Sequence, residues 1–211
     1  MTPELIQQLG DDLFAALRER RTLVPFTNRF SEITVEDAYG ISLQFLNRRV
    51  AAGERVIGKK IGVTSKPVQD MLGVFQPDFG FLTDAMHCAD GATVSLKQTG
   101  LIQPKAEGEI AFMLKADLKG PGITREQVMA ATEWVAPCFE IVDSRIDDWK
   151  IKIQDTVADN ASCGVFVVGQ QHTDPYALDL AAAAMQMWKN DAPAGAGLGS
   201  AVQGHPAEAV A

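Results

Sequence analysis

The pattern of apolar residues changes near residue 56, and this change is the strongest constraint on the fold. Upstream of it, apolar residues recur at the spacing of amphipathic helices, whereas downstream short β-rich runs are bounded by Gly, Pro and Asp. The runs cover roughly residues 57–63, 79–82, 92–95, 107–115, 138–143 and 163–168. We therefore predict an α+β fold with an N-terminal helical segment over 1–55 and a β-rich core over 56–211.

Three helix starts carry capping signals. Thr2 precedes a proline at the first helical position and a stripe of apolar residues at helical spacing. Thr34 opens a segment that resembles a capping box, and the helix that follows is predicted to end at Gly53. A third box over 124–127 predicts a helix that extends to Val135.

Composition excludes several classes of protein. The 211 residues include 27 Asp and Glu against 19 Lys and Arg, a net charge of −8, which argues against a polyanionic partner because binding phosphates needs concentrated positive charge. With 46% apolar residues the chain can bury a core. No apolar run reaches the roughly 18 residues of a membrane span, and the N-terminus begins as an acidic amphipathic helix rather than a secretion signal. We predict a cytoplasmic protein.

The cysteines and histidines give no sign of a soft-metal or disulfide site. The three cysteines are Cys88, Cys138 and Cys163. They are far apart and form no CxxC pair, which favours buried thiols in a reducing compartment. The three histidines are His87, His172 and His205. All lie in loop-like or tail contexts, which is typical of surface histidines rather than catalytic ones.

A pair of glutamates carries the clearest chemical signal. Within the run 103–114, Glu107 and Glu109 would leave the same face of a strand, with only Gly108 between them. Two carboxylates on one face repel each other unless a cation lies there, and a hard divalent ion such as Mg²⁺ or Mn²⁺ prefers oxygen ligands. The alternative is the solvated polar face of an edge strand.

Glu140 strengthens the metal interpretation. It lies within the apolar run 138–142, predicted as a buried strand, where an isolated carboxylate needs a partner or a metal ion. Three carboxylates would leave positions of an octahedral ion open to water and a chelating substrate. The alternative is that Glu140 pairs with Arg145 or Lys60.

Further polar groups are candidates for chemistry. Alternation sends Lys59 and Lys60 to opposite faces of one strand, so one of them points inward. An inward lysine could bind an anion or stabilise an enolate. The alternative is a lysine at the end of the strand whose ammonium reaches back to water. Asp78 follows Gln-Pro in a turn, and its alternative role is turn chemistry. The polar segment 155–162 offers either pocket-lining side chains or a hydrogen-bonded turn. Its candidates are Asp159, Asn160 and Ser162.

Five segments together resemble a known family. They are Ile57-Gly-Lys-Lys-Ile-Gly-Val-Thr-Ser65, Leu72-Gly-Val-Phe-Gln-Pro-Asp-Phe-Gly80, Gln103-Pro-Lys-Ala-Glu-Gly-Glu109, Glu140-Ile-Val-Asp-Ser-Arg145 and Asp155-Thr-Val-Ala-Asp-Asn-Ala-Ser162. The sequence resembles the 2-oxopent-4-enoate (2-hydroxypenta-2,4-dienoate) hydratases, in the hydratase and decarboxylase branch of the fumarylacetoacetate hydrolase superfamily. The resemblance runs in order over nearly the whole chain, including the Gly- and Ala-rich segment 195–206.

The resemblance implies N-terminal helices packed on a mixed β-roll or partly closed β-barrel, which in the family continues with C-terminal strands beyond Ala211. It implies a homo-oligomer, with a sister decarboxylase as a further partner, and a small 2-oxo or 2-hydroxy dienoic acid as substrate. The implied cofactor is Mg²⁺ or Mn²⁺. The implied metal ligands are Glu107, Glu109 and Glu140, and the implied catalytic groups are Lys60 and Asp78.

The activity implied by the resemblance is metal-dependent addition of water to 2-hydroxypenta-2,4-dienoate, giving 4-hydroxy-2-oxopentanoate in the meta-cleavage of aromatic compounds. One alternative is the sister 4-oxalocrotonate decarboxylase activity. Asp78 favours the hydratase, because loss of CO₂ needs no water-activating carboxylate at that position. Another alternative is an inactive subunit that serves as an oligomer partner.

Overall fold

The computed structural model describes residues 1–70 and 73–211, and gives the backbone alone at 71 and 72, so the first residue of the Leu72–Gly80 motif lies outside the fully described part. The helices are α1 (Pro3–Glu19), α2 (Phe26–Arg29), α3 (Val35–Ala51), α4 (Lys66–Leu72), α5 (Leu96–Thr99), α6 (Arg125–Ala131), α7 (Ile153–Ala158) and α8 (Pro206–Val210). The strands are β1 (Val56–Gly62), β2 (Asp78–Thr83), β3 (His87–Cys88), β4 (Lys105–Leu114), β5 (Thr132–Val142), β6 (Cys163–Val168), β7 (Ala184–Lys189) and β8 (Ala192–Leu198).

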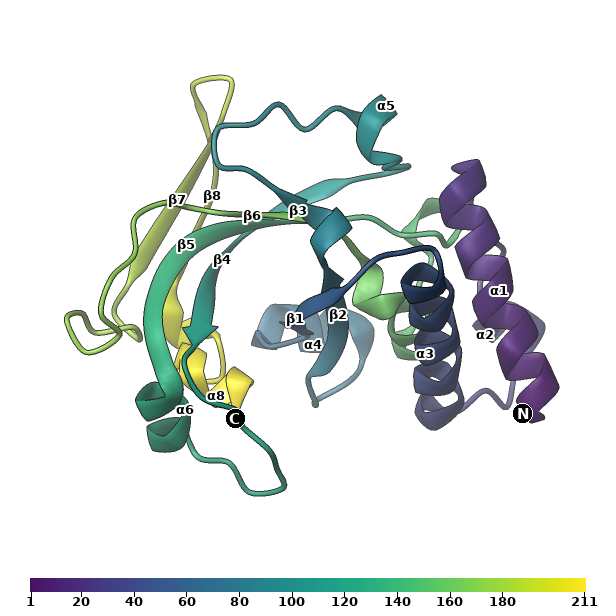
Figure 1. Ribbon diagram of the computed structural model, residues 1–211, viewed down its shortest axis with the longest axis horizontal. Coiled ribbons are helices and arrows are strands. Elements are labelled where there is room, and N and C mark those ends of the chain that lie inside the picture. The colour runs from purple at the N-terminus through teal and green to yellow at the C-terminus, as the bar shows by residue number, and fades with distance from the viewer. The chain divides into compact units, whose positions relative to one another are not determined.

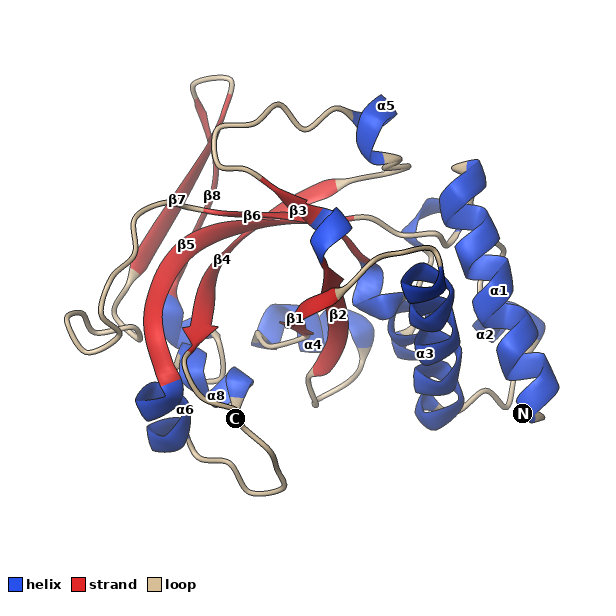
Figure 2. Cartoon of the chain, in the orientation of Figure 1, coloured by secondary structure: helices blue, strands red, loops and turns tan.

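The strands form three sheets (Figure 2). β1 pairs with β2, β7 pairs with β8, and a four-stranded sheet has the order β3-β6-β5-β4. The β1–β2 and β7–β8 pairs are antiparallel, whereas β3 and β6 are parallel. The chain is thus a mixed α+β structure with several sheets, and none of the sheets that the described residues form closes into a barrel.

The first two long helices begin at the predicted caps. Thr2 accepts a hydrogen bond from the first turn of α1, and Thr34 and Asp37 form a reciprocal capping box at the start of α3. The two helices lie side by side (Figure 1). Gly10 permits their close approach, because a Cβ there would lie 2.8 Å from the carbonyl oxygen of Ile41.

The β1–β2 pair places its polar candidates on one face. Directly opposite residues of antiparallel strands project to the same side of the sheet. Lys60 lies opposite Gly80, and Gly62 lies opposite Asp78. Lys60, Gly62, Asp78 and Gly80 therefore share a face.

The other face of β1–β2 is aromatic. Lys59 lies opposite Phe81, and its ammonium is 5.1 Å from the ring centroid of Phe79 and 5.6 Å from that of Phe81. The ring of Tyr39 from α3 stacks on Phe79 at 4.7 Å. Of the two lysines, Lys59 is exposed and Lys60 faces inward, as the alternation predicts for one of them.

Two secondary-structure predictions are wrong. Residues 92–95 lie in a loop ahead of α5 and form no strand. The helix that Thr124 caps ends at Ala131, and Trp134 and Val135 belong to β5. Their helical spacing is overridden because the segment pairs between β4 and β6 in the four-stranded sheet.

The β7–β8 hairpin has no counterpart among the predicted elements. Its turn residues Asn190 and Asp191 both have positive φ, 49° and 63°, as in the type I′ turns that join paired strands. Ala and Gly dominate β8 and weaken its alternation pattern, so periodicity alone does not reveal the strand.

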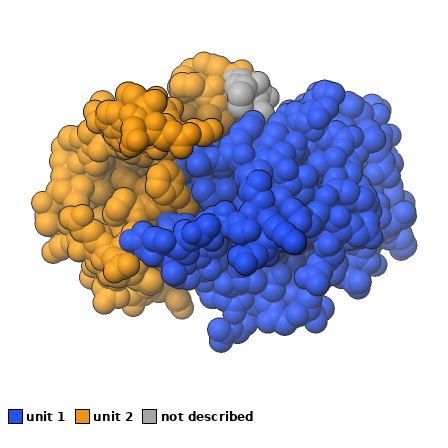
Figure 3. Space-filling view, turned by 90° about the horizontal axis from the view of Figure 1, so that it is seen from above, with its two compact units in different colours: residues 1–62, 78–107, 140–167 blue, residues 63–77, 108–139, 168–211 orange. Residues whose placement is uncertain are grey.

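The chain divides into two compact units (Figure 3). Unit 1 comprises residues 1–62, 78–107 and 140–167, and unit 2 comprises 63–77, 108–139 and 168–211. Buried apolar side chains of unit 1 include Leu9, Leu13, Phe26, Ile41, Phe45, Ile146 and Val157. Those of unit 2 include Val128, Val135, Leu180 and Ala207. The predicted boundary near residue 55 stays a prediction.

Among the described residues, no helix has both the length and the hydrophobicity that crossing a membrane requires. The three cysteines are in the reduced form; Cys163 is buried, as predicted, while Cys88 and Cys138 are half-buried.

Candidate metal centre and active site

Glu140 on β5 is a buried carboxylate, only 2% exposed. Among the described residues, its two carboxylate oxygens and Oδ1 of Asp78 are the buried side-chain oxygens that accept no hydrogen bond. Lys60 Nζ lies 3.3 Å from Oε2 of Glu140 and forms an ion pair with it. Buried carboxylate lone pairs are costly unless a cation or donor completes them, so the arrangement favours a further positive charge at Glu140.

Glu107 and Glu109 bring two more carboxylates to Glu140. The sheet order sets β4 directly beside β5, and oxygen atoms from all three side chains lie within 4.8 Å of one another. Glu107 is exposed, Glu109 half-buried and Glu140 buried. An oxygen-only donor set of this kind fits Mg²⁺, Mn²⁺ or Ca²⁺ rather than zinc or copper.

The environment of Glu140 shifts its protonation. Burial raises the pKa of Glu140 and the charge of Glu107 raises it further, whereas Lys60 and the thiol of Cys163 oppose the rise. Burial and the Glu140 carboxylate raise the pKa of the Cys163 thiol well above its ordinary value, which disfavours the thiolate that a nucleophilic cysteine needs. A bound cation would favour ionised Glu140, which links metal binding to proton release.

Lys60 and Asp78 are the polar side chains on the shared face of β1–β2. Lys60 Nζ donates a hydrogen bond to the carbonyl oxygen of Ala161 at 3.0 Å. Asp78 is 4% exposed; burial raises its pKa, while the Lys60 ammonium and the backbone N–H groups of Asp78 and Gly62 oppose the rise. An ammonium beside a carboxylate of raised pKa can hold and transfer protons.

The backbone turn at residues 160–162 holds the acceptor for Lys60. Asn160, Ala161 and Ser162 all have φ between 51° and 55°, the left-handed region that non-glycine residues seldom adopt. The Asn160 side chain fixes the turn to β2, because Oδ1 accepts from the N–H of Phe81 at 2.7 Å and Nδ2 donates to its carbonyl at 2.9 Å.

Asp159 is bound by Arg145 in a fully buried ion pair. Arg145 Nε donates to Oδ1 of Asp159 at 2.6 Å, and the Arg145 backbone N–H donates to Oδ2 at 2.8 Å. Arg145 thus pairs with Asp159, whereas Glu140 pairs with Lys60. These contacts fit the hydrogen-bonded turn that was one reading of segment 155–162; direct substrate contact by its residues stays a prediction.

Sequence reasoning missed two groups that hold the start of β4. The carboxylate of Asp143 accepts hydrogen bonds from the backbone N–H groups of Ile102 and Gln103, at 3.0 and 2.7 Å. Gln103 Nε2 donates to the carbonyl oxygens of Ser144 and Ile146 at 2.9 and 2.6 Å. Asp143 and Gln103 lie within the quoted motifs, so membership of a motif was the available signal.

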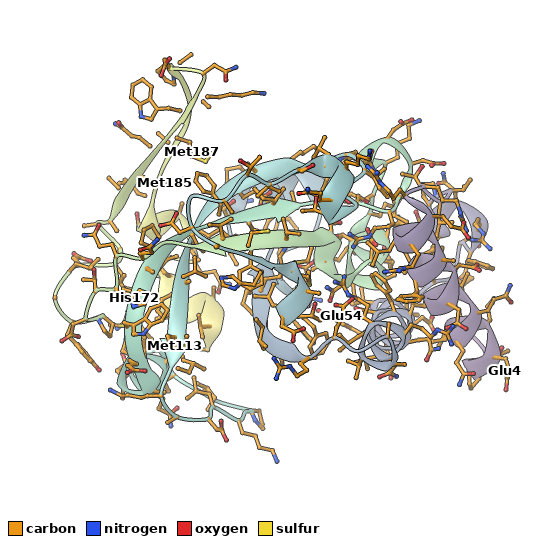
Figure 4. The ribbon with its side chains drawn as sticks, turned by 45° about the horizontal axis from the view of Figure 1, so that its top comes forward. Glu4, Glu54, Met113, His172, Met185 and Met187 are labelled. Carbon is orange, nitrogen blue, oxygen red and sulfur yellow. The ribbon has the colours of Figure 1, made fainter. Side chains whose placement is uncertain are left out.

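Gly108 lies between the two glutamates of β4 and packs against β7. A Cβ at Gly108 would collide with the sulfur of Met185 and lie 3.3 Å from that of Met187. Both methionines lie on β7 (Figure 4). The β7–β8 hairpin therefore supports the strand that carries Glu107 and Glu109.

The histidines occupy structural positions. His172 stacks on Trp134 with ring centroids 3.7 Å apart, and His205 caps α8 through Nδ1. His87 lies against the ring of Phe166 at 5.2 Å. In the described part of the chain, the cluster of possible metal ligands contains none of the three.

Residues 48–211 match the family model described as fumarylacetoacetate (FAA) hydrolase C-terminal. The chain belongs to the fumarylacetoacetate hydrolase family. Among members of this family, a 2-hydroxyhexa-2,4-dienoate hydratase of Comamonas testosteroni is 76% identical over 99% of this chain and 79% of its own length. A 2-hydroxypent-2,4-dienoate hydratase of Pseudomonas putida is 60% identical over 100% of this chain and 95% of its own. The resemblance found in the sequence is confirmed.

Solved structures of the family agree with the fold. The 4-oxalocrotonate decarboxylase from Pseudomonas putida G7, complexed with magnesium and adipate, superposes with a TM-score of 0.94 at 35% identity, covering 99% of this chain and 78% of that one. The same decarboxylase complexed with calcium and acetate has a TM-score of 0.92, with the same identity and coverage.

Proposed function

We propose that this member of the fumarylacetoacetate hydrolase family is a hydro-lyase that adds water to 2-hydroxypenta-2,4-dienoate and forms 4-hydroxy-2-oxopentanoate in meta-cleavage catabolism of aromatic compounds. The acidic cluster carries the proposal: Glu140 is 2% exposed, its oxygens accept no hydrogen bond from the described residues, and they lie within 4.8 Å of carboxylate oxygens of Glu107 and Glu109. The names of relatives that are 60% and 76% identical support the reaction.

In this proposal, Glu107, Glu109 and Glu140 hold a divalent ion, Mg²⁺ or Mn²⁺. When bound, the ion supplies Lewis-acid stabilisation of the negative charge that a 2-oxo acid develops as its enolate. Support comes from the oxygen-only donor set and from the magnesium and calcium in the solved structures of the 35% identical decarboxylase.

Asp78 would transfer protons, and Lys60 would stabilise negative charge on the substrate. The enol proton of the dienoate leaves, and C5 gains a proton. The oxygen of water then bonds to C4 and the water gives up one of its protons, while C3 gains a proton. Asp78 suits these transfers because burial raises its pKa and its Oδ1 accepts no hydrogen bond from a described residue. The ammonium of Lys60 suits the anionic oxygens of the substrate.

Asp159, Asn160 and Ser162 are proposed to line the substrate side through the turn that they form. Their support is the bond between Lys60 Nζ and the carbonyl oxygen of Ala161 in the same turn. A small movement of this turn would shift the ammonium that faces the substrate.

Decarboxylation of 4-oxalocrotonate is the second candidate function. The observation that favours it is the TM-score of 0.94 to the decarboxylase from Pseudomonas putida G7. The buried carboxylate of Asp78 favours the hydratase, because losing CO₂ from a 2-oxo acid requires an electron sink but no group that activates water.

The test is an assay of the purified chain with and without divalent metal. We expect the ultraviolet absorbance of 2-hydroxypenta-2,4-dienoate to decay only with Mg²⁺ or Mn²⁺, without release of CO₂. The 2-hydroxyhexa-2,4-dienoate should be assayed beside it, since the 76% identical relative carries that name. Metal-dependent CO₂ release from 4-oxalocrotonate would establish the decarboxylase instead, and loss of neither substrate would leave a non-catalytic subunit.

Expectations about assembly, location and fold complete the proposal. The chain would act as a homo-oligomer, with a sister decarboxylase as a further partner, and in the cytoplasm. Its three sheets would be parts of one partly closed β-roll, with the helices of 1–55 packed on the β core of 56–211. Support for the roll is the likeness to the solved decarboxylase over 99% of this chain.

A further inference from the structure

The glycine at position 62 faces the candidate acid–base residue directly. Gly62 ends β1 and lies opposite Asp78, which begins β2, so the two residues project to the same face. Lys60, two positions earlier on β1, also projects there. The side chain that Gly62 lacks would therefore enter the space between the Asp78 carboxylate and the Lys60 ammonium.

The space at Gly62 is already filled by these two groups. A Cβ at this position would overlap Oδ1 of Asp78, lie 3.4 Å from its Cγ and lie 3.2 Å from Lys60 Nζ. Asp78 is 4% exposed, so its carboxylate has no open route into solvent. The backbone N–H of Gly62 also interacts with the Asp78 carboxylate. The carboxylate thus lies over the glycine backbone where a side chain would otherwise stand.

Backbone conformation does not explain why residue 62 is a glycine. The glycines with positive φ in the described chain are Gly53, Gly73, Gly91, Gly100, Gly122 and Gly204. Gly62 is not among them, so its φ is one that alanine adopts without strain. Glycine in a strand interior weakens the strand, and at position 62 the compensating feature is room for Asp78.

We infer that Gly62 is a positioning residue for the proposed hydration: the absence of its side chain lets the Asp78 carboxylate lie against β1 beside the Lys60 ammonium. The inference rests on the proposed function, in which Asp78 transfers protons. Gly62→Ala would turn the carboxylate away from this position while leaving the three glutamates unchanged.

The first experiment compares Gly62→Ala with Gly58→Ala. Both glycines lie on β1 and project to the same face, but a Cβ at Gly58 meets its nearest neighbour, Cδ1 of Leu82, at an ordinary 3.6 Å. We expect Gly62→Ala to lower kcat roughly 100-fold, the usual effect of a misplacement of about 1 Å, while KM and Mn²⁺ affinity stay within about threefold. Gly58→Ala should keep kcat within about twofold.

A double-variant cycle separates positioning from a general loss of structure. In an Asp78→Ala background the carboxylate is gone, so adding Gly62→Ala should lower neither kcat nor the free energy of unfolding in urea any further. Equal losses in both backgrounds, or an unchanged kcat in Gly62→Ala alone, would overturn the inference. If Gly62→Ala does not fold, folding of the double variant supports the inference and its failure to fold overturns it.

The proposed function can fail separately. If Asp78→Ala keeps full turnover, Asp78 is not the acid–base group, and a crystal structure of Gly62→Ala then decides the positioning inference. A carboxylate displaced from its place over residue 62 supports the inference, and a carboxylate that stays there overturns it. If Asp78→Ala is inactive but Gly62→Ala is fully active, the proposed role of Asp78 stands and the inference falls.

Discussion

Replacing Glu140 by Gln should separate the intrinsic stability of the protein from its stabilisation by a divalent ion. The substitution keeps the size of a side chain that is 2% exposed and removes its charge. In metal-free protein, two effects oppose each other. The attraction of Lys60 at 3.3 Å amounts to about 5 kcal/mol at an effective dielectric constant near 20, and burying each charged group costs several kcal/mol. Breaking a buried ion pair costs about 3–5 kcal/mol when one charge is left unpaired, but Lys60 keeps its hydrogen bond to the carbonyl oxygen of Ala161 and its attraction to Asp78, so we expect a loss of no more than about 2 kcal/mol.

With metal present, the two proteins should differ clearly. At a metal concentration of about 100 times Kd, binding stabilises the native state by about 2.7 kcal/mol. For a chain of this length that corresponds to a rise in Tm of roughly 5–10 °C. Loss of a ligand carboxylate should weaken binding about 100-fold or more, because outer-shell partners alone account for 10- to 100-fold. At the same concentration the variant would then gain about 0.4 kcal/mol, a rise of roughly 1–2 °C.

The assay is thermal unfolding of both proteins with Mn²⁺ or Mg²⁺ titrated against a chelator blank. Glu133→Gln is the matched control, because Glu133 lies on the same strand as Glu140 but is exposed. The control should keep the metal-induced rise in Tm. An equal rise in Glu140→Gln and in the wild type would refute the assignment of Glu140 as a ligand, whatever happens to turnover.

Three substitutions test the turn beside the candidate site, each by urea unfolding. Asn160→Ala leaves the N–H and C=O of Phe81 without their side-chain partner and should lower the free energy of unfolding by about 1–3 kcal/mol. A loss near zero would mean that Asn160 does not form these two hydrogen bonds. Arg145→Met leaves the carboxylate of Asp159 buried and unpaired and should cost about 3–5 kcal/mol, and a neutral result would contradict the buried ion pair. Ala161→Gly relieves a φ of 51° and should raise stability by up to about 1 kcal/mol, so a clear loss would show that the left-handed conformation is not strained.

The helix starts and the glutamate pair could be predicted because they depend on contacts within a few residues. Thr34 and Asp37 form hydrogen bonds to each other's backbone N–H groups across three positions, and this spacing is visible in the sequence. Glu107 and Glu109 share a face because alternate residues of any strand do. Glu140 was visible as a charge inside an apolar run, and Lys60 was one of the two partners that the sequence offered for it.

Features that depend on strand pairing or on the third dimension could not be predicted. Alternation leaves open which of Lys59 and Lys60 faces inward, and the choice follows from which side of β1–β2 receives Phe79 and Tyr39. The partner of Arg145 also required the fold, because Asp159 is 14 residues away and six other carboxylates are nearer in sequence. The helix spacing of residues 128–135 was overridden by pairing within the sheet.

The face of β1–β2 that carries Lys60 alternates polar side chains with glycines, and the glycines leave room for groups from other segments. Gly62 leaves room for the carboxylate of Asp78, and a Cβ at Gly80 would overlap the carbonyl oxygen of Asn160. On periodicity alone, two glycines in short strands count against strand formation. Here the missing side chains let a carboxylate and a backbone turn come close to the ammonium of Lys60, so that groups from three segments meet on one face.

The charges at this face explain why a cation fits beside it. Lys60 supplies one positive charge, while Asp78 and Glu140 are both nearly inaccessible to water and cannot be screened by it. Glu107 adds a third negative charge close enough to raise the pKa of both buried carboxyls. The raised pKa values favour the protonated forms of Asp78 and Glu140, and a divalent ion would favour their ionised forms. If the proposed metal site is correct, a bound cation would offset part of the net charge of −8.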